Sequence, residues 1–380
     1  MSVDAAWSQR WLATRDRLLA SPRFQRWAAA FPLTRPIARR RARQLFDLCA
    51  GFVYTQILLA CVRLRLFEIL AERPQTTAEL ARKMSLSGES ADRLLAAATA
   101  LRLVEKRGDE RYALGPLGAP MVGNTGLAAM VEHHSVLYGD LDDPVALLRG
   151  ERRDTGLSRY WSYASSDRPI DLCGEHVSAY TRLMAASQPL VAGEILDAYP
   201  MYRHQCLLDV GGGDGSFLAS AAQRAPGLRV ILFDLPPVAE RARSRFAAAG
   251  LADRAIAVGG DFHVDPLPAG ADVISLIRVI HDHDDAQALS ILVAVRRALP
   301  PDGTLLLAEP LAGTRGAEPV GDAYFGFYLM AMGQGRPRTR AAIEALLRAA
   351  GFRRPRWMRT RIPLQTCLLA AEPMVDGSGR

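Results

Sequence analysis

Cysteine, lysine and long apolar runs are scarce in this chain of 380 residues. The five cysteines are scattered, odd in number and without C-x-x-C spacing, which favours neither a disulfide framework nor a zinc site. No apolar run approaches the roughly 20 residues that span a bilayer. The amino terminus carries charges where a signal peptide has an apolar core. These absences predict a cytoplasmic protein whose cysteines are small buried hydrophobic residues.

Lysine is so rare that 45 of the 47 basic residues are arginine. The net charge of +7 nevertheless belongs to one segment. Residues 1–45 hold ten arginines and two aspartates, a balance of +8, which leaves −1 for residues 46–380. A neutral body with a basic amino-terminal arm does not indicate a nucleic-acid-binding protein.

The arm, residues 1–45, mixes its arginines with large apolar side chains. These are Trp7, Trp11, Leu18, Leu19, Phe24, Trp27 and Phe31. The composition is typical of a helix that lies on an anionic membrane surface, here the inner or an intracytoplasmic membrane, or that docks on a partner. The alternative is a solvated arm that packs on the body or on a second subunit.

Residues 46–122 begin with an apolar helix over 46–70. A helix with apolar residues over most of its circumference must be buried, and a subunit interface would bury it. Thr76 and Glu79 then predict a capping box before a short helix over 77–84.

A further helix over 91–103 and two short strands around a turn at Gly108 complete the pattern of a winged helix. Its last helix contains only Arg93 and Arg102 as basic residues, among leucines and alanines. We therefore expect this helix to pack against other elements and not to bind DNA.

After a helical, aromatic-rich segment over 123–200, which we expect to form one wall of a substrate pocket, strands and helices alternate through a domain at 201–375. The alternation predicts an open parallel α/β sheet. Strands are expected over 206–210, 229–234, 254–258, 271–277 and 303–309, and helices over 216–225, 236–249, 284–298 and 339–350. Two extended segments, near 355–360 and 363–371, follow the last helix. This terminal pair is characteristic of the Rossmann-like sheet of class I methyltransferases.

The stretch Leu207–Phe217 runs from an apolar strand through an acid and a glycine cluster into a helix, the form of a nucleotide-binding turn. Its glycines, Gly211, Gly213 and Gly215, have the spacing G-x-G-x-G. Ser216 stands where the third glycine of a dinucleotide fingerprint would be. The ligand is therefore not expected to be a dinucleotide.

Two acidic residues further restrict the identity of the expected ligand. Asp209 ends the strand before the glycines, where it suits a ligand amine. Asp234 ends the next strand, where a carboxylate could hold both hydroxyls of a ribose. An amine and a ribose without phosphate describe S-adenosylmethionine. The alternative is an ordinary glycine turn without a ligand.

Ligands of open α/β sheets bind at the carboxyl ends of the strands. Asp261 and Phe262 suit the exocyclic amine and the face of an adenine at that edge, and His281 follows the fourth strand directly as the best candidate for a general base. The alternative for His281 is a helix-capping role. With its acidic neighbours His281 lacks the known metal-ligand spacings, so no metal is expected. The predicted cofactor-binding residues are Asp209, Gly211, Gly213, Gly215, Asp234, Leu235, Asp261, Phe262 and Arg278.

These motifs, behind an amino-terminal winged helix, resemble the plant-caffeate and acetylserotonin type of O-methyltransferase over about residues 46–375. The resemblance is carried by Leu207–Gly215, Gly260–Phe262, Arg278–Asp285 and Glu309. Within that group, Met130–Leu141 and Asp322–Met332 resemble the bacterial carotenoid O-methyltransferases that act on hydroxyneurosporene or demethylspheroidene.

The resemblance implies that the winged helix forms a homodimer, that His281 is the general base, and that Glu309 orients it. The chain departs from the family at two positions. Pro337 occupies the place of a second glutamate, and Ile277 that of a lysine usual in the plant enzymes. Orientation of His281 would then depend more on Glu309 or on Asp282.

The implied reaction transfers a methyl group from S-adenosylmethionine to a hydroxyl of an apolar small molecule, the 1-hydroxyl of an acyclic carotenoid. An aromatic and methionine-rich lining would suit such a substrate. The residues predicted to line it are Met184, Tyr324, Phe327, Tyr328 and Met332. The alternatives are a phenol or a tetrapyrrole carbon as methyl acceptor, and a winged-helix regulator with a domain that senses S-adenosylmethionine.

Overall fold

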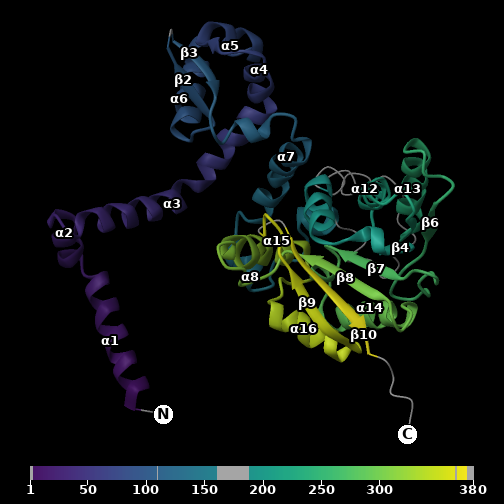
Figure 1. Cartoon of the computed structure of the whole chain (residues 1–380). Coiled ribbons are helices and arrows are strands. Elements are labelled where there is room, and N and C mark those ends of the chain that lie inside the picture. Colours follow the sequence, from purple (N-terminus) through teal and green to yellow (C-terminus); the bar gives the residue numbers. More distant parts are fainter. Residues whose placement is uncertain (1–2, 109, 161–187, 364–365, 375–380) are drawn as a thin grey trace. The chain divides into compact units, whose positions relative to one another are not determined.

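The computed structural model describes residues 3–108, 110–160, 188–363 and 366–374, which fall into two compact units, Met1–Val122 and Gly123–Arg380 (Figure 1). The first unit begins with helices α1 (Val3–Ala20), α2 (Pro22–Ala30) and α3 (Arg35–Arg63). Helix α3 continues without a break through residue 45, so the basic arm and the apolar segment after it share one helix.

The apolar helix predicted over 46–70 is in fact two helices. Helix α3 ends at Arg63, and Arg65 adopts a left-handed backbone, with φ of 55°, before α4 (Leu66–Glu72). The break buries Leu66 and Phe67 at the start of α4. A left-handed residue other than glycine is uncommon, and nothing in the local sequence indicates it.

Helix α3 exposes large apolar side chains within its unit. They are Leu45, Phe46, Leu48, Phe52 and Val53. An 18-residue window of the helix has a mean hydropathy of 1.8 and is 11% buried, so by length and composition alone it could cross a membrane. The uninterrupted apolar runs are short, as expected from the sequence, because Asp47, Thr55 and Gln56 interrupt them, but the helix is apolar on average.

The rest of the first unit is the predicted winged helix. Helices α5 (Thr77–Met84) and α6 (Gly88–Ala100) precede strands β2 (Val104–Arg107) and β3 (Arg111–Leu114), and β3 also pairs with the short β1 (Gln75–Thr76). A short 3-10 helix, Ala119–Met121, ends the unit. The core includes Cys61, Phe67, Leu80, Leu95 and Val104.

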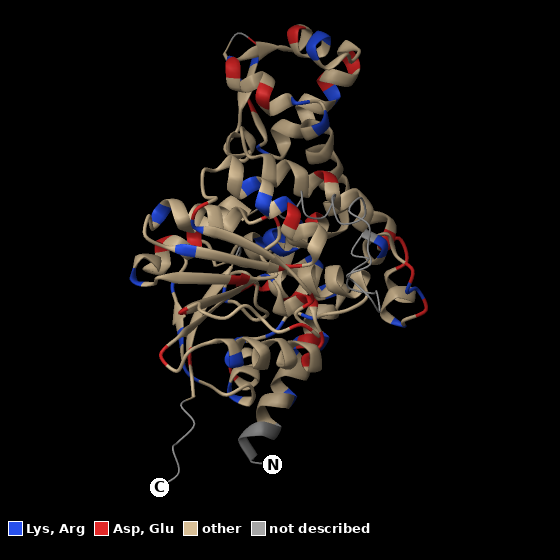
Figure 2. Ribbon diagram, turned by 90° about the vertical axis from the view of Figure 1, so that its right-hand side faces the viewer, with Lys and Arg blue, Asp and Glu red and all other residues tan. Residues whose placement is uncertain are grey.

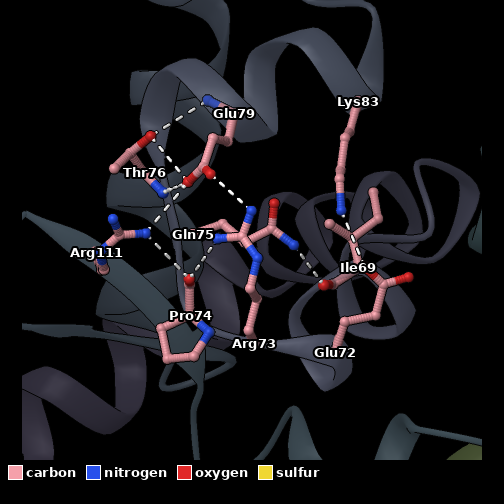
Figure 3. Close-up of polar contacts among 9 residues, drawn as sticks. All are labelled: Ile69, Glu72, Arg73, Pro74, Gln75, Thr76, Glu79, Lys83 and Arg111. Atoms are coloured by element: carbon pink, nitrogen blue, oxygen red, sulfur yellow. Dashed lines mark hydrogen bonds and ion pairs between the residues drawn. The ribbon is translucent and has the colours of Figure 1, made fainter.

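The predicted capping box begins α5 (Figure 3). The backbone N–H of Glu79 donates to Oγ1 of Thr76 at 3.3 Å, and the N–H of Thr76 donates to Oε2 of Glu79 at 2.8 Å. Arg73 and Arg111 reach the same carboxylate at 2.8 and 3.4 Å. The bond from Arg73 and then that from Thr76 lower the pKa of Glu79 to about 2. The start of α5 is thereby joined to strand β3.

Charged residues of both signs are interspersed over the helices and the hairpin of the winged helix (Figure 2). On α6, Arg93 pairs with Glu89 at 3.0 Å, while Ala91, Leu95 and Ala98 are buried. The helix uses its apolar face for packing, as its sequence predicts.

The second unit is built on a seven-stranded sheet in the order β6-β5-β4-β7-β8-β10-β9. The strands are β4 (Cys206–Val210), β5 (Arg229–Asp234), β6 (Ala255–Gly259), β7 (Val273–Ile277), β8 (Thr304–Glu309), β9 (Phe352–Met358) and β10 (Cys367–Pro373). The first five are parallel, and β10 lies antiparallel between β8 and β9. The predicted class I methyltransferase sheet is confirmed, with its terminal pair shifted by a few residues.

Helices cover both faces of this sheet, because alternate strand residues point to opposite sides. One core joins the strands to α12 (Ser216–Arg224), α13 (Pro236–Ala248) and a helix over 188–198. The other joins them to α14 (Asp285–Ala298) and α16 (Arg340–Ala349).

A smaller helical group in the same unit packs around one buried cluster. It comprises α7 (Thr125–Asp140), α8 (Pro144–Leu148), α9 (Gly156–Tyr160), the π-helix η5 (Pro319–Tyr324) and α15 (Phe325–Met332). π-Helical turns are rare and are frequent at functional sites.

Candidate active site

The glycine turn between β4 and α12 has a left-handed backbone at three of its four glycines. Their φ angles are 70° at Gly211, 62° at Gly213 and 79° at Gly215, a conformation that side chains disfavour. A Cβ on Gly211 would lie 2.9 Å from Val279 and 3.8 Å from the ring of Phe262. A Cβ on Gly213 would meet no atom within 4 Å. The turn is therefore packed at Gly211 and leaves bare backbone at Gly213.

Asp209 ends β4 and is 1% exposed. Its Oδ1 accepts a hydrogen bond from Oγ of Ser275 at 2.6 Å, whereas Oδ2 has no partner among the described residues. Burial raises the pKa of Asp209 to about 7, against the bond from Ser275. An unsatisfied buried carboxylate oxygen is costly to the fold. It is an acceptor of the kind predicted here for a ligand amine.

Asp234 ends β5 next to the glycine turn. Its Oδ2 accepts from the N–H of Gly213 at 2.8 Å, and its Oδ1 from the N–H of Leu235 at 2.7 Å. Burial raises the pKa of Asp234 to about 6 despite these two bonds. Leu235 precedes the first turn of α13 and so links the carboxylate to that helix.

Phe262 forms an aromatic group with two histidines. Its ring centroid lies 4.7 Å from that of His263 and 5.5 Å from that of His283, both edge to face. Asp261 accepts the N–H of His263 at 2.9 Å on Oδ1. The structure thus brings the ring predicted to bind adenine to the edge of the glycine turn.

These residues fit S-adenosylmethionine, which supplies an activated methyl group when it is bound. The free oxygen of Asp209 matches an amine, the open backbone at Gly213 allows close approach, and Phe262 offers a ring face. Asp234 stands beside them where a ribose would need an acceptor. The role of each single residue stays a prediction.

His281 lies in a 3-10 turn, Ile280–Asp282, that follows β7, and is 7% exposed. Its Nδ1 contacts Oε2 of Glu309, the last residue of β8. Oε1 of Glu309 accepts the N–H of Val279 at 3.0 Å and that of Ile280 at 2.7 Å. When Nδ1 carries the ring proton and directs it at this carboxylate, Nε2 presents a lone pair.

The carboxylates around His281 make it more basic. Burial lowers the pKa of His281, but the charges of Asp282 and Glu309 outweigh burial, so the pKa is raised. Oδ1 of Asp282 lies 3.0 Å from Nε2, outside hydrogen-bond geometry, which leaves Nε2 open to another donor. Burial raises the pKa of Asp282 to about 6, against the charge of His281.

Arg278 occupies the bend between β7 and this turn. It is a non-glycine residue with φ of 56°, a conformation that is uncommon and often found at functional sites. Its N–H donates to the carbonyl of Ala308 at 2.8 Å, and its Nη2 donates to Gln188 at 3.2 Å. The bend therefore ties β7, β8 and the helix over 188–198 together.

The residues predicted to line the substrate site are only partly brought together. Tyr328 and Met332 are buried in the small helical cluster, against which Tyr324 packs, and Phe327 is half-buried. Phe325, which the sequence does not single out, packs its ring edge to face on that of His281 at 5.7 Å. Met184 lies outside the described residues, and the lining role of the group stays a prediction.

Three further residues at the site escape prediction from sequence. Ser275 holds Asp209, and the only signal is a polar residue in an otherwise apolar strand. Gln188 holds Arg278 without any sequence signal. Arg338 is 2% exposed, and its burial is not predictable from an arginine between a proline and a threonine.

Two family models match the chain. An O-methyltransferase domain matches residues 138–353, more than half of the chain, and an O-methyltransferase dimerisation domain matches residues 46–124. The chain belongs to the O-methyltransferase family. This confirms the predicted family, and the protein is an S-adenosylmethionine-dependent O-methyltransferase.

Known O-methyltransferases are similar to this one over most of its length. Demethylspheroidene O-methyltransferase of Cereibacter sphaeroides is 44% identical over 337 residues, which cover 88% of each chain. The demethylspheroidene O-methyltransferase of Rhodobacter capsulatus is 39% identical over 357 residues, covering 94% of this chain and 88% of that one. The solved human N-acetylserotonin methyltransferase shares the fold, with a TM-score of 0.73, 23% identity and coverage of 88% and 98%.

The dimerisation domain of this O-methyltransferase supports a homodimer. It begins at residue 46, in the part of α3 that exposes Phe46, Phe52 and Val53. A second copy of the chain would give these side chains the apolar cover that the isolated unit lacks.

Proposed function

We propose that this O-methyltransferase methylates the 1-hydroxyl of an acyclic carotenoid such as hydroxyneurosporene or demethylspheroidene. The observation that carries the proposal is the similarity to two demethylspheroidene O-methyltransferases, at 44% and 39% identity over most of the chain. The aromatic part of the surroundings of His281 also supports an apolar substrate.

Those surroundings come from helix α15 and the π-helix before it. The ring centroids of Tyr324, Phe325 and Tyr328 lie 5.1 to 6.5 Å from one another, and Phe325 contacts His281. Burial raises the pKa of Tyr324, so its hydroxyl stays neutral. Binding of an apolar polyene in such a setting has a small desolvation cost.

In the proposed reaction His281 acts as the general base. The substrate hydroxyl would donate its proton to Nε2 while its oxygen forms the new bond to the methyl carbon, and the bond from that carbon to the sulfonium sulfur would break and leave a neutral thioether. A tertiary alcohol holds its proton much more tightly than a phenol. A histidine with a raised pKa, stabilised by Glu309 once protonated, is suited to that task.

Labelled S-adenosylmethionine and a panel of acceptors test the substrate. We expect a labelled methoxy product with 1-hydroxylated acyclic carotenoids in detergent, and no product with the same carotenoids lacking the hydroxyl. Caffeate and a tetrapyrrole substrate serve as competing acceptors. Product formation from either of them alone, with none from the carotenoids, contradicts the proposal.

We also propose that the basic arm attaches the enzyme to the cytoplasmic face of the membrane in which such carotenoids dissolve. Trp7, Trp11 and Trp27 are at least half exposed, and residues 1–45 carry a balance of +8. Exposed aromatics and excess arginine together suit an anionic lipid surface.

Sedimentation of the full chain with lipid vesicles tests this attachment. We expect binding to vesicles with anionic phospholipid, reversed by salt, and little binding to phosphatidylcholine alone. Each arginine near the surface contributes about 1 kcal/mol, so the fourfold change of Arg39, Arg40, Arg41 and Arg43 to Gln should abolish most binding. The matched control changes the exposed Arg297, Arg354, Arg356 and Arg359 to Gln. Equal loss in both variants, or none in either, rules the arm out as the anchor.

A further inference from the structure

Arg338 is a buried arginine beside the turn that carries His281. It follows Pro337, which stands where the family commonly has a second glutamate. Its side chain is 1% exposed, although its partner carboxylate, Asp285, is 51% exposed. A buried guanidinium needs acceptors for its donors, and here the main chain provides two of them.

The guanidinium of Arg338 joins both ends of the catalytic turn. Its Nη1 donates to the carbonyl of Ile280 at 2.6 Å, and its Nη2 donates to the carbonyl of His283 at 2.7 Å. These two residues flank His281 and Asp282. Nε and Nη2 also donate to Oδ1 of Asp285, at 3.0 and 2.8 Å, which fixes the plane of the guanidinium.

The backbone before Arg338 reinforces this arrangement. The N–H of Arg336 donates to the carbonyl of His281 at 2.9 Å. Gly335, with φ of 83°, packs so closely that a Cβ there would overlap this same carbonyl. The carbonyl of Arg338 accepts the N–H of Ala312 at 3.0 Å, just beyond the end of β8. The guanidinium of Arg338 and the carboxylate of Glu309 therefore both hold the turn.

We propose that Arg338 is a positioning residue that sets the orientation of His281 and replaces the support a second glutamate would give. The inference rests on the proposed role of His281 as general base. Arg338 contacts the backbone of the turn and not the imidazole, and the charges that act on His281 are those of Asp282, Glu309 and Arg278. It therefore acts by geometry, and small displacements of a reacting group slow catalysis steeply.

The test compares Arg338→Ala with a matched arginine. Arg254 also donates to several main-chain carbonyls, those of Ala222, Ala225, Pro226 and Leu228, but at the far ends of the strands. We expect Arg338→Ala to lower kcat about 10²-fold, with the dissociation constant for S-adenosylmethionine unchanged. Arg254→Ala should leave kcat within about twofold of the parent.

Two further measurements separate positioning from general damage. Guanidinium ion at low concentration should restore part of kcat in Arg338→Ala and none in a His281→Ala, Arg338→Ala double variant. Arg338→Lys, which keeps the charge and fewer donors, should have intermediate kcat. If Arg338→Ala does not fold, Arg338→Lys takes its place in the comparison with Arg254→Ala.

The double variant also decides how Arg338 acts. If Arg338 works through His281, its removal costs nothing further once His281 is alanine. A further loss of the same size in that background, or equal kcat in Arg338→Ala and Arg254→Ala, overturns the proposal. Full activity of His281→Ala alone would instead contradict the role of His281 as general base. The error would then lie in the proposed function and not in the inference about Arg338.

Discussion

The Nδ1 atom of His281 contacts Oε2 of Glu309, a residue 28 positions further along the chain. The two residues follow or end neighbouring parallel strands, β7 and β8, so the sheet itself brings them together. Glu309 also holds two backbone N–H groups of the bend before His281 through its other oxygen. One carboxylate therefore orients the ring and its backbone at once.

Replacement of His281 by alanine tests the base directly. We expect kcat to fall roughly 10²-fold or more, because a positioned base contributes about that factor. Binding of S-adenosylmethionine should be retained, since the glycine turn does not involve the imidazole. Calorimetric titration with the cofactor and initial rates with the carotenoid measure the two effects. Retained turnover would remove His281 from the mechanism.

Replacement of Glu309 by glutamine should move the pH dependence of catalysis. Glu309 raises the pKa of His281, so its neutral replacement lowers that pKa. Because only the unprotonated imidazole is a base, kcat/KM is lost as pH falls through this pKa. The acid limb should therefore shift to lower pH in Glu309→Gln, with a maximum reduced roughly 10²-fold. An acid limb at unchanged or higher pH contradicts the assignment.

Asp209 should lower the stability of the fold while it strengthens binding of the cofactor. Its folded-state pKa of about 7 lies above the ordinary 3.8, so its stabilising contribution is complete below pH 3.8 and is lost as pH rises through 7. The full pKa shift corresponds to a change of roughly 4 kcal/mol in the free energy of unfolding, as an upper bound. Asp209→Asn, which still accepts from Ser275, should raise the unfolding temperature, and more at pH 8 than at pH 5.

The same variant should bind S-adenosylmethionine more weakly, because an amide offers a cationic amine no charge. Thermal unfolding at the two pH values measures the change in stability, and titration with the cofactor measures the change in affinity. Ser275→Ala provides the comparison, since it removes the hydrogen bond to Asp209 and keeps the charge. A destabilised Asp209→Asn, or one with unaltered affinity, would show that burial of Asp209 has another purpose.

Much of the fold follows from the sequence because apolar strands alternate with capped helices. Strands β4 and β5 and helix α5 have the predicted bounds, and the other elements predicted after residue 90 differ by at most four residues at either end. The failures have local physical causes. Arg65 breaks a helix by adopting a left-handed conformation that the neighbouring residues do not indicate, and α3 exposes an apolar surface that the rest of its unit does not cover.

The candidate site likewise contains residues that the sequence predicts and contacts that it does not. Asp209, His281 and Glu309 were predictable because each follows or ends a strand, and parallel strands deliver their carboxyl ends to one edge. Contacts made by segments distant in sequence were not predictable. The bond from Arg338 to the carbonyl of Ile280 spans 58 residues, and that between His134 and Tyr324 spans 190. No periodicity in the sequence encodes such pairs.

Tyr324 links helix α7 to the aromatic group beside His281, and its replacement by phenylalanine should affect the acceptor alone. Its hydroxyl hydrogen-bonds Nε2 of His134 at 2.9 Å, and its ring packs on Phe325 at 5.1 Å. Burial lowers the pKa of His134 and raises that of Tyr324, so both groups are neutral at pH 7. Loss of the hydroxyl leaves the half-buried ring nitrogen of His134 without this partner, at a cost of about 1 kcal/mol.

The loosened helix pair should raise KM for the carotenoid severalfold while the dissociation constant for S-adenosylmethionine stays constant, because the glycine turn lies on other elements. Steady-state kinetics with each substrate varied in turn measure this difference. Tyr202→Phe, at a tyrosine that is 71% exposed, is the control and should alter neither quantity. If Tyr324→Phe weakens cofactor binding as much as carotenoid binding, the aromatic group supports the whole site and does not select the acceptor.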